Sequence, residues 1–113
     1  MENGKRIKLF SALIFFFPIK LMAQEADSTQ LALHLGDLLA SETLCKLSFK
    51  QEAIERFIDE RVRADDLSFP SQLSLFTDGK RYEQKSMSES QKTAHCRQTA
   101  RLAESYGFVE KGQ

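Results

Sequence analysis

The sequence predicts an all-α fold: a small three- to four-helix domain, stapled by one disulfide and placed after an N-terminal signal peptide. Three observations support this prediction. Apolar residues recur at steps of three and four, which is the helical period. Serine residues stand three positions ahead of Gln or Glu, as in helix capping boxes. Finally, Cys45 and Cys96 are the only cysteines in a chain of 113 residues, which has room for one domain.

Residues 1–23 have the order of a secretory signal peptide. Lys5, Arg6 and Lys8 precede an apolar run, residues 9–19. As a helix this run rises only about 16 Å, roughly half the hydrocarbon thickness of a bilayer, so it is too short to span alone. We expect cleavage after Ala23, which leaves residues 24–113 as a helical domain with no membrane span; the alternative is a retained anchor. The predicted location is therefore periplasmic or secreted.

The first helix of the exported part is expected to begin at a cap formed by Asp27 and Ser28 and to run to about Ala40. Its leucines lie at helical spacing. Gly36 weakens the pattern, because glycine is a poor helix former. Residues 41–43 are expected to break the chain before Cys45.

The clearest helical signal follows Ser48. Ser48 and Gln51 match a capping box, and the predicted helix of about fifteen residues carries one apolar stripe. The stripe consists of Phe49, Ala53, Ile54, Phe57, Ile58 and Val62. On the opposite side, the pairs Glu52–Arg56 and Asp59–Arg63 have the spacing of intrahelical ion pairs.

A short helical element is expected over residues 72–77, closed by Asp78 and Gly79, with residues 80–85 as a surface loop. The last helix has two overlapping capping boxes, one starting at Ser86 and one at Ser88. It should end at Tyr106, with Gly107 in the left-handed conformation. Its expected inner face is Ala94, Cys96, Ala100, Ala103 and Tyr106, flanked by Leu102.

Cys45 and Cys96 are predicted to form an internal structural disulfide. Two cysteines in a small exported domain most often pair, because the compartment is oxidising. A redox role is disfavoured, since the chain lacks a C-x-x-C motif. His95 adjoins Cys96, but neighbouring residues on a helix point in different directions, so the two do not form a catalytic dyad.

The sequence offers few candidates for a functional site. The exported part carries a slight excess of acidic residues, which gives no electrostatic basis for binding nucleic acid. No catalytic or nucleotide-binding motif is present, and neither a metal site nor a cofactor is expected, because the two histidines and two paired cysteines supply too few ligands. Arg97 and Arg101 lie one helical turn apart and are weak candidates for binding an acidic partner; a solvated helix face is the alternative.

Short motifs in the exported part resemble a group of small two-cysteine helical proteins exported by Gram-negative bacteria, most of them uncharacterised. These motifs are residues 44–47 (LCKL), 53–58 (AIERFI), 92–96 (KTAHC) and 105–108 (SYGF), and the resemblance covers residues 41–108. In layout, the chain is also distantly similar to the HdeA family of periplasmic acid-stress chaperones. That similarity implies a helical fold with one disulfide between widely spaced cysteines.

We therefore expect a non-enzymatic binding or interaction protein whose protein partner is unknown. The alternative is an acid-activated chaperone similar to HdeA, which would bind unfolded clients. In acid its carboxylates lose their charge while the basic groups keep theirs, so repulsion would loosen the helices and expose apolar faces.

Overall fold

The computed structural model describes residues 16–112. Within this range it contains four helices: α2 (Phe16–Leu44), α3 (Gln51–Arg61), α4 (Phe69–Gln84) and α5 (Glu89–Ser105). The all-α prediction is confirmed for this part of the chain. Residues 1–15 of the predicted signal peptide lie outside the described range. None of the described helices combines the length and apolarity that crossing a membrane would require.

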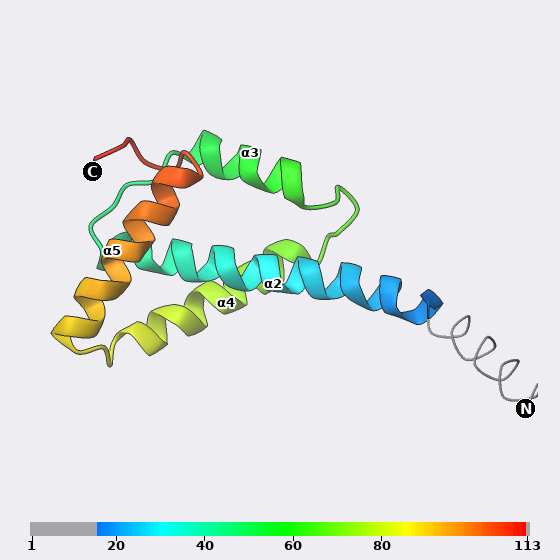
Figure 1. Ribbon diagram of the computed structural model, residues 1–113, viewed down its shortest axis with the longest axis horizontal. Helices are drawn as coiled ribbons and strands as arrows, with labels where there is room; N and C mark the ends of the chain where they lie inside the picture. The colour runs from blue at the N-terminus through cyan, green and yellow to red at the C-terminus, as the bar shows by residue number, and fades with distance from the viewer. Residues whose placement is uncertain (1–15, 113) are drawn as a thin grey trace, which may run out of the picture.

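The long helix α2 and helix α4 lie side by side and run in the same direction (Figure 1). Two hydrogen bonds fix this alignment. Near the start of α4, Ser28 of α2 donates to Asp66 (2.6 Å), and at its end Gln84 donates to Ser41 of α2 (2.8 Å). Helix α5 crosses the end of α2, and α3 lies above α2 in the view of Figure 1.

Gly36 lets α2 and α4 approach closely. A Cβ at this position would lie 3.0 Å from Phe76 Cβ and 3.1 Å from Thr77 N, both close to the α4 backbone. Glycine is a poor helix former, but at position 36 its lack of a side chain permits close packing of α2 against α4.

The core joins two groups of apolar side chains. Leu35 and Leu38 of α2 are buried together with Phe69 of α4. At the other side, the rings of Phe49, Phe57, Tyr106 and Phe108 pack against one another with centroids 4.8–5.7 Å apart. The predicted stripe is confirmed: Phe49, Ala53 and Phe57 are buried, and Ile54, Ile58 and Val62 are half-buried against this core.

The predicted end of the first helix is wrong. Helix α2 continues to Leu44, through the expected break at residues 41–43, and at its other end it starts before Asp27. The break does not form because Ser41 donates its hydroxyl proton to the carbonyl of Asp37, one turn earlier, and is fully buried. A side-chain hydroxyl can satisfy itself in this way inside a helix.

The predicted capping box at Ser48 is also wrong. Helix α3 begins after Lys50, which makes no side-chain cap, and Ser48 is exposed. The Glu42 carboxylate instead accepts the Phe49 N–H at 2.7 Å, because the end of α2 lies beside this turn. Of the expected ion pairs, Arg63 pairs with Asp65 at 2.9 Å instead of Asp59.

Helix α4 replaces the predicted short element and loop with one continuous helix of 16 residues. It passes through Asp78 and Gly79 because its inner face stays engaged with α2 for the whole length. Thr77 and Gln84, two turns apart, are both buried there. Tertiary packing thus outweighs the weak local signal of Asp-Gly.

Helix α5 starts at the second of the two expected capping boxes. Ser88 and Gln91 exchange side-chain and backbone hydrogen bonds at 2.9 and 3.2 Å. The predicted stop at Gly107 is confirmed, with φ of +74°. The expected inner face is confirmed in part. Ala103 is buried, and three residues are half-buried: Cys96, Ala100 and Tyr106. Ala94 is exposed, whereas Thr99, which was not expected on this face, is buried.

The two glycines of α2 and α4 give opposite predictions. Gly36→Val should lower the free energy of unfolding by about 1–3 kcal/mol, because its side chain would force the helices apart. Gly79→Ala should raise it by roughly 0.5–1 kcal/mol, because nothing lies within 4 Å of a Cβ there and alanine favours the helix. Urea unfolding followed by circular dichroism measures both. A neutral Gly36→Val variant would contradict the close α2–α4 contact.

Candidate functional site

The disulfide joins the end of α2 to α5. Cys45 directly follows the last residue of α2, and Cys96 lies two turns into α5; their Cα atoms are 5.2 Å apart and their sulfurs 2.05 Å apart. The predicted pairing is therefore confirmed. Both residues are half-buried.

One turn before Cys45, Ser41 is the centre of a buried polar cluster that also contains Gln84 and His95. Gln84 Nε2 lies 2.8 Å and His95 Nε2 lies 2.6 Å from Ser41 Oγ. A hydroxyl has one proton and two lone pairs. The Asp37 carbonyl lies 2.7 Å from Ser41 Oγ, and one lone pair of the hydroxyl accepts from Gln84. Whether Ser41 or His95 Nε2 donates in their contact depends on the tautomer of the imidazole. The cluster thus links α2, α4 and α5.

The Ser41–His95 contact has the residue types of a nucleophile and its base, but its geometry is that of a structural link. Ser41 has no solvent-exposed surface. A nucleophile must be reached by its substrate, so this buried contact serves to position α2, α4 and α5.

This cluster was not predicted from the sequence. A signal was present, because Ser41 continues the stripe of Leu35 and Leu38 on α2, and Gln84 lies seven residues after buried Thr77 on α4. Polar residues on an otherwise buried helical face must be hydrogen-bonded, and they tend to meet one another. His34, on the same helix as Ser41, is exposed.

A shallow groove lies between α3 and the end of α5. Its volume is about 270 Å³, and it is lined by Ala53, Arg56, Phe57, Glu60, Arg61, Ser105 and Tyr106. The floor is aromatic, because the rings of Phe57 and Tyr106 lie 4.8 Å apart. The walls carry two arginines and one glutamate.

Arg61 is held in place by stacking. Its guanidinium lies 4.1 Å from the centroid of the Phe57 ring and 5.6 Å from that of Tyr106. Its neighbour Glu60 is 3.4 Å away and both side chains remain partly exposed, at 41% and 61%. Arg56 lies on the groove wall, and no ion pair involves it in the described part of the chain.

The weak candidates from the sequence, Arg97 and Arg101, do not line this groove. Both are exposed on the outer face of α5, and Arg101 donates to Gln98 at 3.0 Å. They lie on the same helix as the groove residue Ser105, one and two turns earlier.

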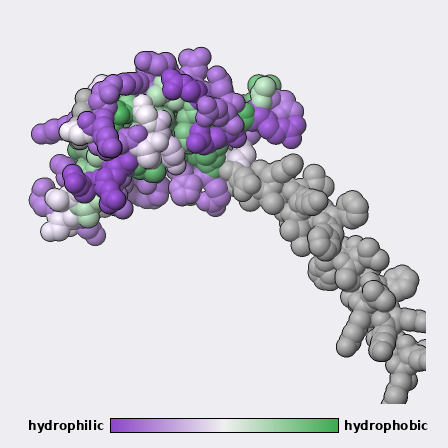
Figure 2. Space-filling model, turned by 45° about the horizontal axis from the view of Figure 1, so that its top comes forward, coloured by the Kyte–Doolittle hydropathy of each residue, from purple (hydrophilic) through white to green (hydrophobic). Residues whose placement is uncertain are grey.

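Other exposed apolar residues are scattered. Leu75 and Tyr82 project from the outer face of α4, but Asp78 and Gly79 lie between them. Figure 2 likewise shows a mainly hydrophilic face with small, separate hydrophobic patches. Single exposed apolar residues of this kind are ordinary on protein surfaces.

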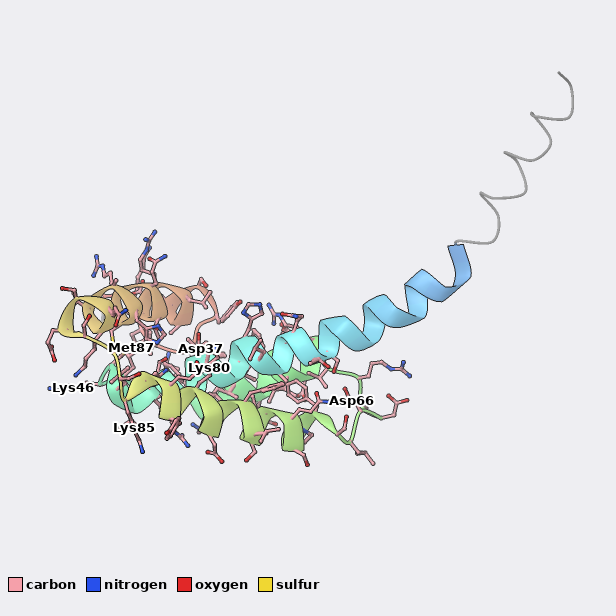
Figure 3. All side chains as sticks on the ribbon, turned by 90° about the horizontal axis from the view of Figure 1, so that it is seen from below. Asp37, Lys46, Asp66, Lys80, Lys85 and Met87 are labelled. Atoms are coloured by element: carbon pink, nitrogen blue, oxygen red, sulfur yellow. A yellow bond between two sulfur atoms is a disulfide. The ribbon has the colours of Figure 1, made fainter. Side chains whose placement is uncertain are left out.

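Two carboxylates tie together segments that are distant in sequence. The hydroxyl of Ser28 donates to Asp66 and, with that of Ser68, lowers the pKa of the Asp66 carboxyl below its usual value. Asp66 lies in the loop before α4, at the opposite end of this helix from Lys46 and Lys85 (Figure 3). Lys50 likewise pairs with Glu110 and lowers the pKa of that carboxyl.

Comparison of the chain with protein families, with curated proteins and with solved structures finds no match.

The lowered pKa of Asp66 predicts a pH-dependent contribution to stability. A carboxyl whose folded pKa lies below its unfolded pKa stabilises the fold above the unfolded value and loses this contribution as the pH falls through the folded one. Asp66→Asn should therefore lower the melting temperature at pH 7, and the difference from the parent should shrink below about pH 4.

Asp65→Asn, on the adjacent exposed residue, is the matched control, since the Asp65 side chain accepts only from Arg63, two residues earlier, within the described part of the chain. Its effect on the melting temperature should be smaller at pH 7. A gap between Asp66→Asn and the parent that stays constant from pH 7 to about 2.5 would contradict the assigned role of Asp66.

Proposed function

We propose that this chain is a small, non-enzymatic binding protein of the periplasm or of the secreted fraction, and that it contacts a protein partner through the α3–α5 groove. The groove is the observation that carries this proposal. An aromatic floor with stacked, partly exposed arginine is typical of binding surfaces, in which aromatic residues and Arg are enriched.

The dimensions of the groove favour a protein partner over a small substrate. Small-molecule sites are usually concave, mostly apolar cavities of about 300–1,000 Å³. This groove is smaller, at about 270 Å³, and three of its seven lining residues are charged. It has room for one or two side chains of a larger molecule.

The disulfide supports the proposed location, because such bonds persist mainly in oxidising compartments. It also supports the binding role. It fixes α5, whose far end forms one wall of the groove, so little order has to be gained when a partner binds.

An acid-activated chaperone similar to HdeA is the second candidate, and the carboxylates Asp66 and Glu110 favour it. Each holds a loop or a terminal segment against a distant part of the chain, through Ser28 and Lys50. Protonation of both carboxylates would release these attachments, while the disulfide would limit the expansion. In this alternative the clients would be many unfolded proteins.

Site-specific photo-crosslinking tests the proposal. A photoreactive side chain replaces Ser105, which lines the groove, and the control places it at exposed Gln98, which does not. In the cells of origin at neutral pH, the Ser105 position should give a covalent adduct with one discrete protein, and the Gln98 position should not. Equal adducts from both positions, or none from Ser105, would contradict the groove as the binding surface.

The same experiment in acid separates the two candidates. A chaperone would crosslink to many proteins below about pH 3 and to none at neutral pH. A binding protein would keep its discrete adduct at neutral pH.

A further inference from the structure

Among the side chains that line the α3–α5 groove, positive charges outnumber negative ones by one. Arg56 and Arg61 lie on its walls with Glu60 as the one acidic residue among its lining side chains. The Arg61–Glu60 contact is long, at 3.4 Å, and joins neighbouring residues on one helix. Neither arginine is therefore held by a close bidentate partner.

Most of the hydrogen-bond donors of Arg61 have no acceptor among the described residues. A guanidinium has five N–H donors, all in its plane. The Cζ atom of Arg61 lies over the Phe57 ring at 4.1 Å and 5.6 Å from the centroid of Tyr106, and Glu60 accepts from one nitrogen only. The aromatic rings therefore contact this guanidinium while most of its donors stay unused.

We infer that this groove binds a carboxylate side chain, Asp or Glu, on an acidic segment of the partner protein. The planar fork of a guanidinium matches the two oxygens of a carboxylate. Arg61, oriented by the rings beneath it, binds this group, and Arg56 adds a second positive charge on the same groove. The inference rests on the proposed function, because it names the chemistry that the groove recognises.

Glu60 competes with the carboxylate of the partner for Arg61. Its carboxylate occupies one donor of Arg61 and repels an incoming carboxylate. Removing its charge should therefore strengthen binding, whereas removing either arginine should weaken it. If Arg61 had only a structural role, the Glu60 variant and the arginine variants would not change the affinity in opposite directions.

The test uses an array of short peptides, acetylated and amidated so that side chains carry the only carboxylates. Each acidic peptide is paired with its Asn or Gln counterpart, and binding of the full disulfide-bonded protein is measured at low and at high salt. Acidic peptides should bind more tightly than their amide counterparts by about tenfold, the effect expected of a hydrogen bond to a charged group, and should lose affinity in high salt.

Four variants locate the site. Arg61→Gln, combined with Arg56→Gln, should reduce affinity for the acidic peptides by about tenfold or more. Arg61→Lys should give an intermediate loss, because it keeps the charge and lacks the planar fork. Glu60→Gln should increase affinity. The matched control is Arg97→Gln with Arg101→Gln, which removes the same charge from exposed positions outside the groove and should change affinity by less than about twofold.

Circular dichroism melting verifies that each variant is folded. Binding without preference for carboxylates, or loss of binding in the Arg97/Arg101 variant alone, would overturn this inference and leave the proposed binding function intact. Failure of every peptide to bind, acidic or not, would count against both the inference and the groove as a protein-binding surface.

Discussion

The covalent and polar connection between the end of α2 and α5 is the constraint on which the rest of the structure depends. The Cys45–Cys96 disulfide and the Ser41–His95 hydrogen bond join the same two helices. Ser41 and Cys45 are one helical turn apart, and His95 and Cys96 are neighbours on α5. Closing a loop of 51 residues removes about 4 kcal/mol of unfolded-chain entropy on a simple polymer model. For a small domain this is a large share of the total stability.

The connection matters because the α2–α4 pair is held by its own interface, whereas α3 is not part of that interface. Helices α2 and α4 share a long interface, closely packed around Gly36. Helix α3 joins the remainder through the aromatic cluster around Phe108 and through the hydrogen bond from Lys50 N–H to the Phe108 carbonyl. Since Phe108 follows α5 directly, α3 depends on the position of α5, which the disulfide sets. The groove lies between α3 and the end of α5, so its shape depends on these contacts.

Periodicity predicted the fold class and the core of α3 from sequence, because burial of a long apolar stripe such as that of Phe49 and Phe57 dominates the energetics. Local cap and turn signals predicted less. Ser48 does not cap α3, which begins only after Lys50, and the Phe49 N–H donates to Glu42 of α2. Asp78-Gly79 does not stop α4, because the contacts of α4 with α2 outweigh this local preference. The disulfide followed from cysteine count. The groove could not be predicted, because it arises where Arg56 and Arg61 of α3 meet a helix some forty residues away in sequence.

Hydrogen exchange of the backbone amides, measured before and after reduction of the disulfide, tests most directly whether the α2–α5 connection holds the groove together. Reduction should remove protection first from α5 and α3, while α2 and α4 stay protected around Gly36, since their interface does not include the disulfide. Uniform loss of protection over all four helices, or unchanged protection in α3 and α5, would contradict this role of the connection.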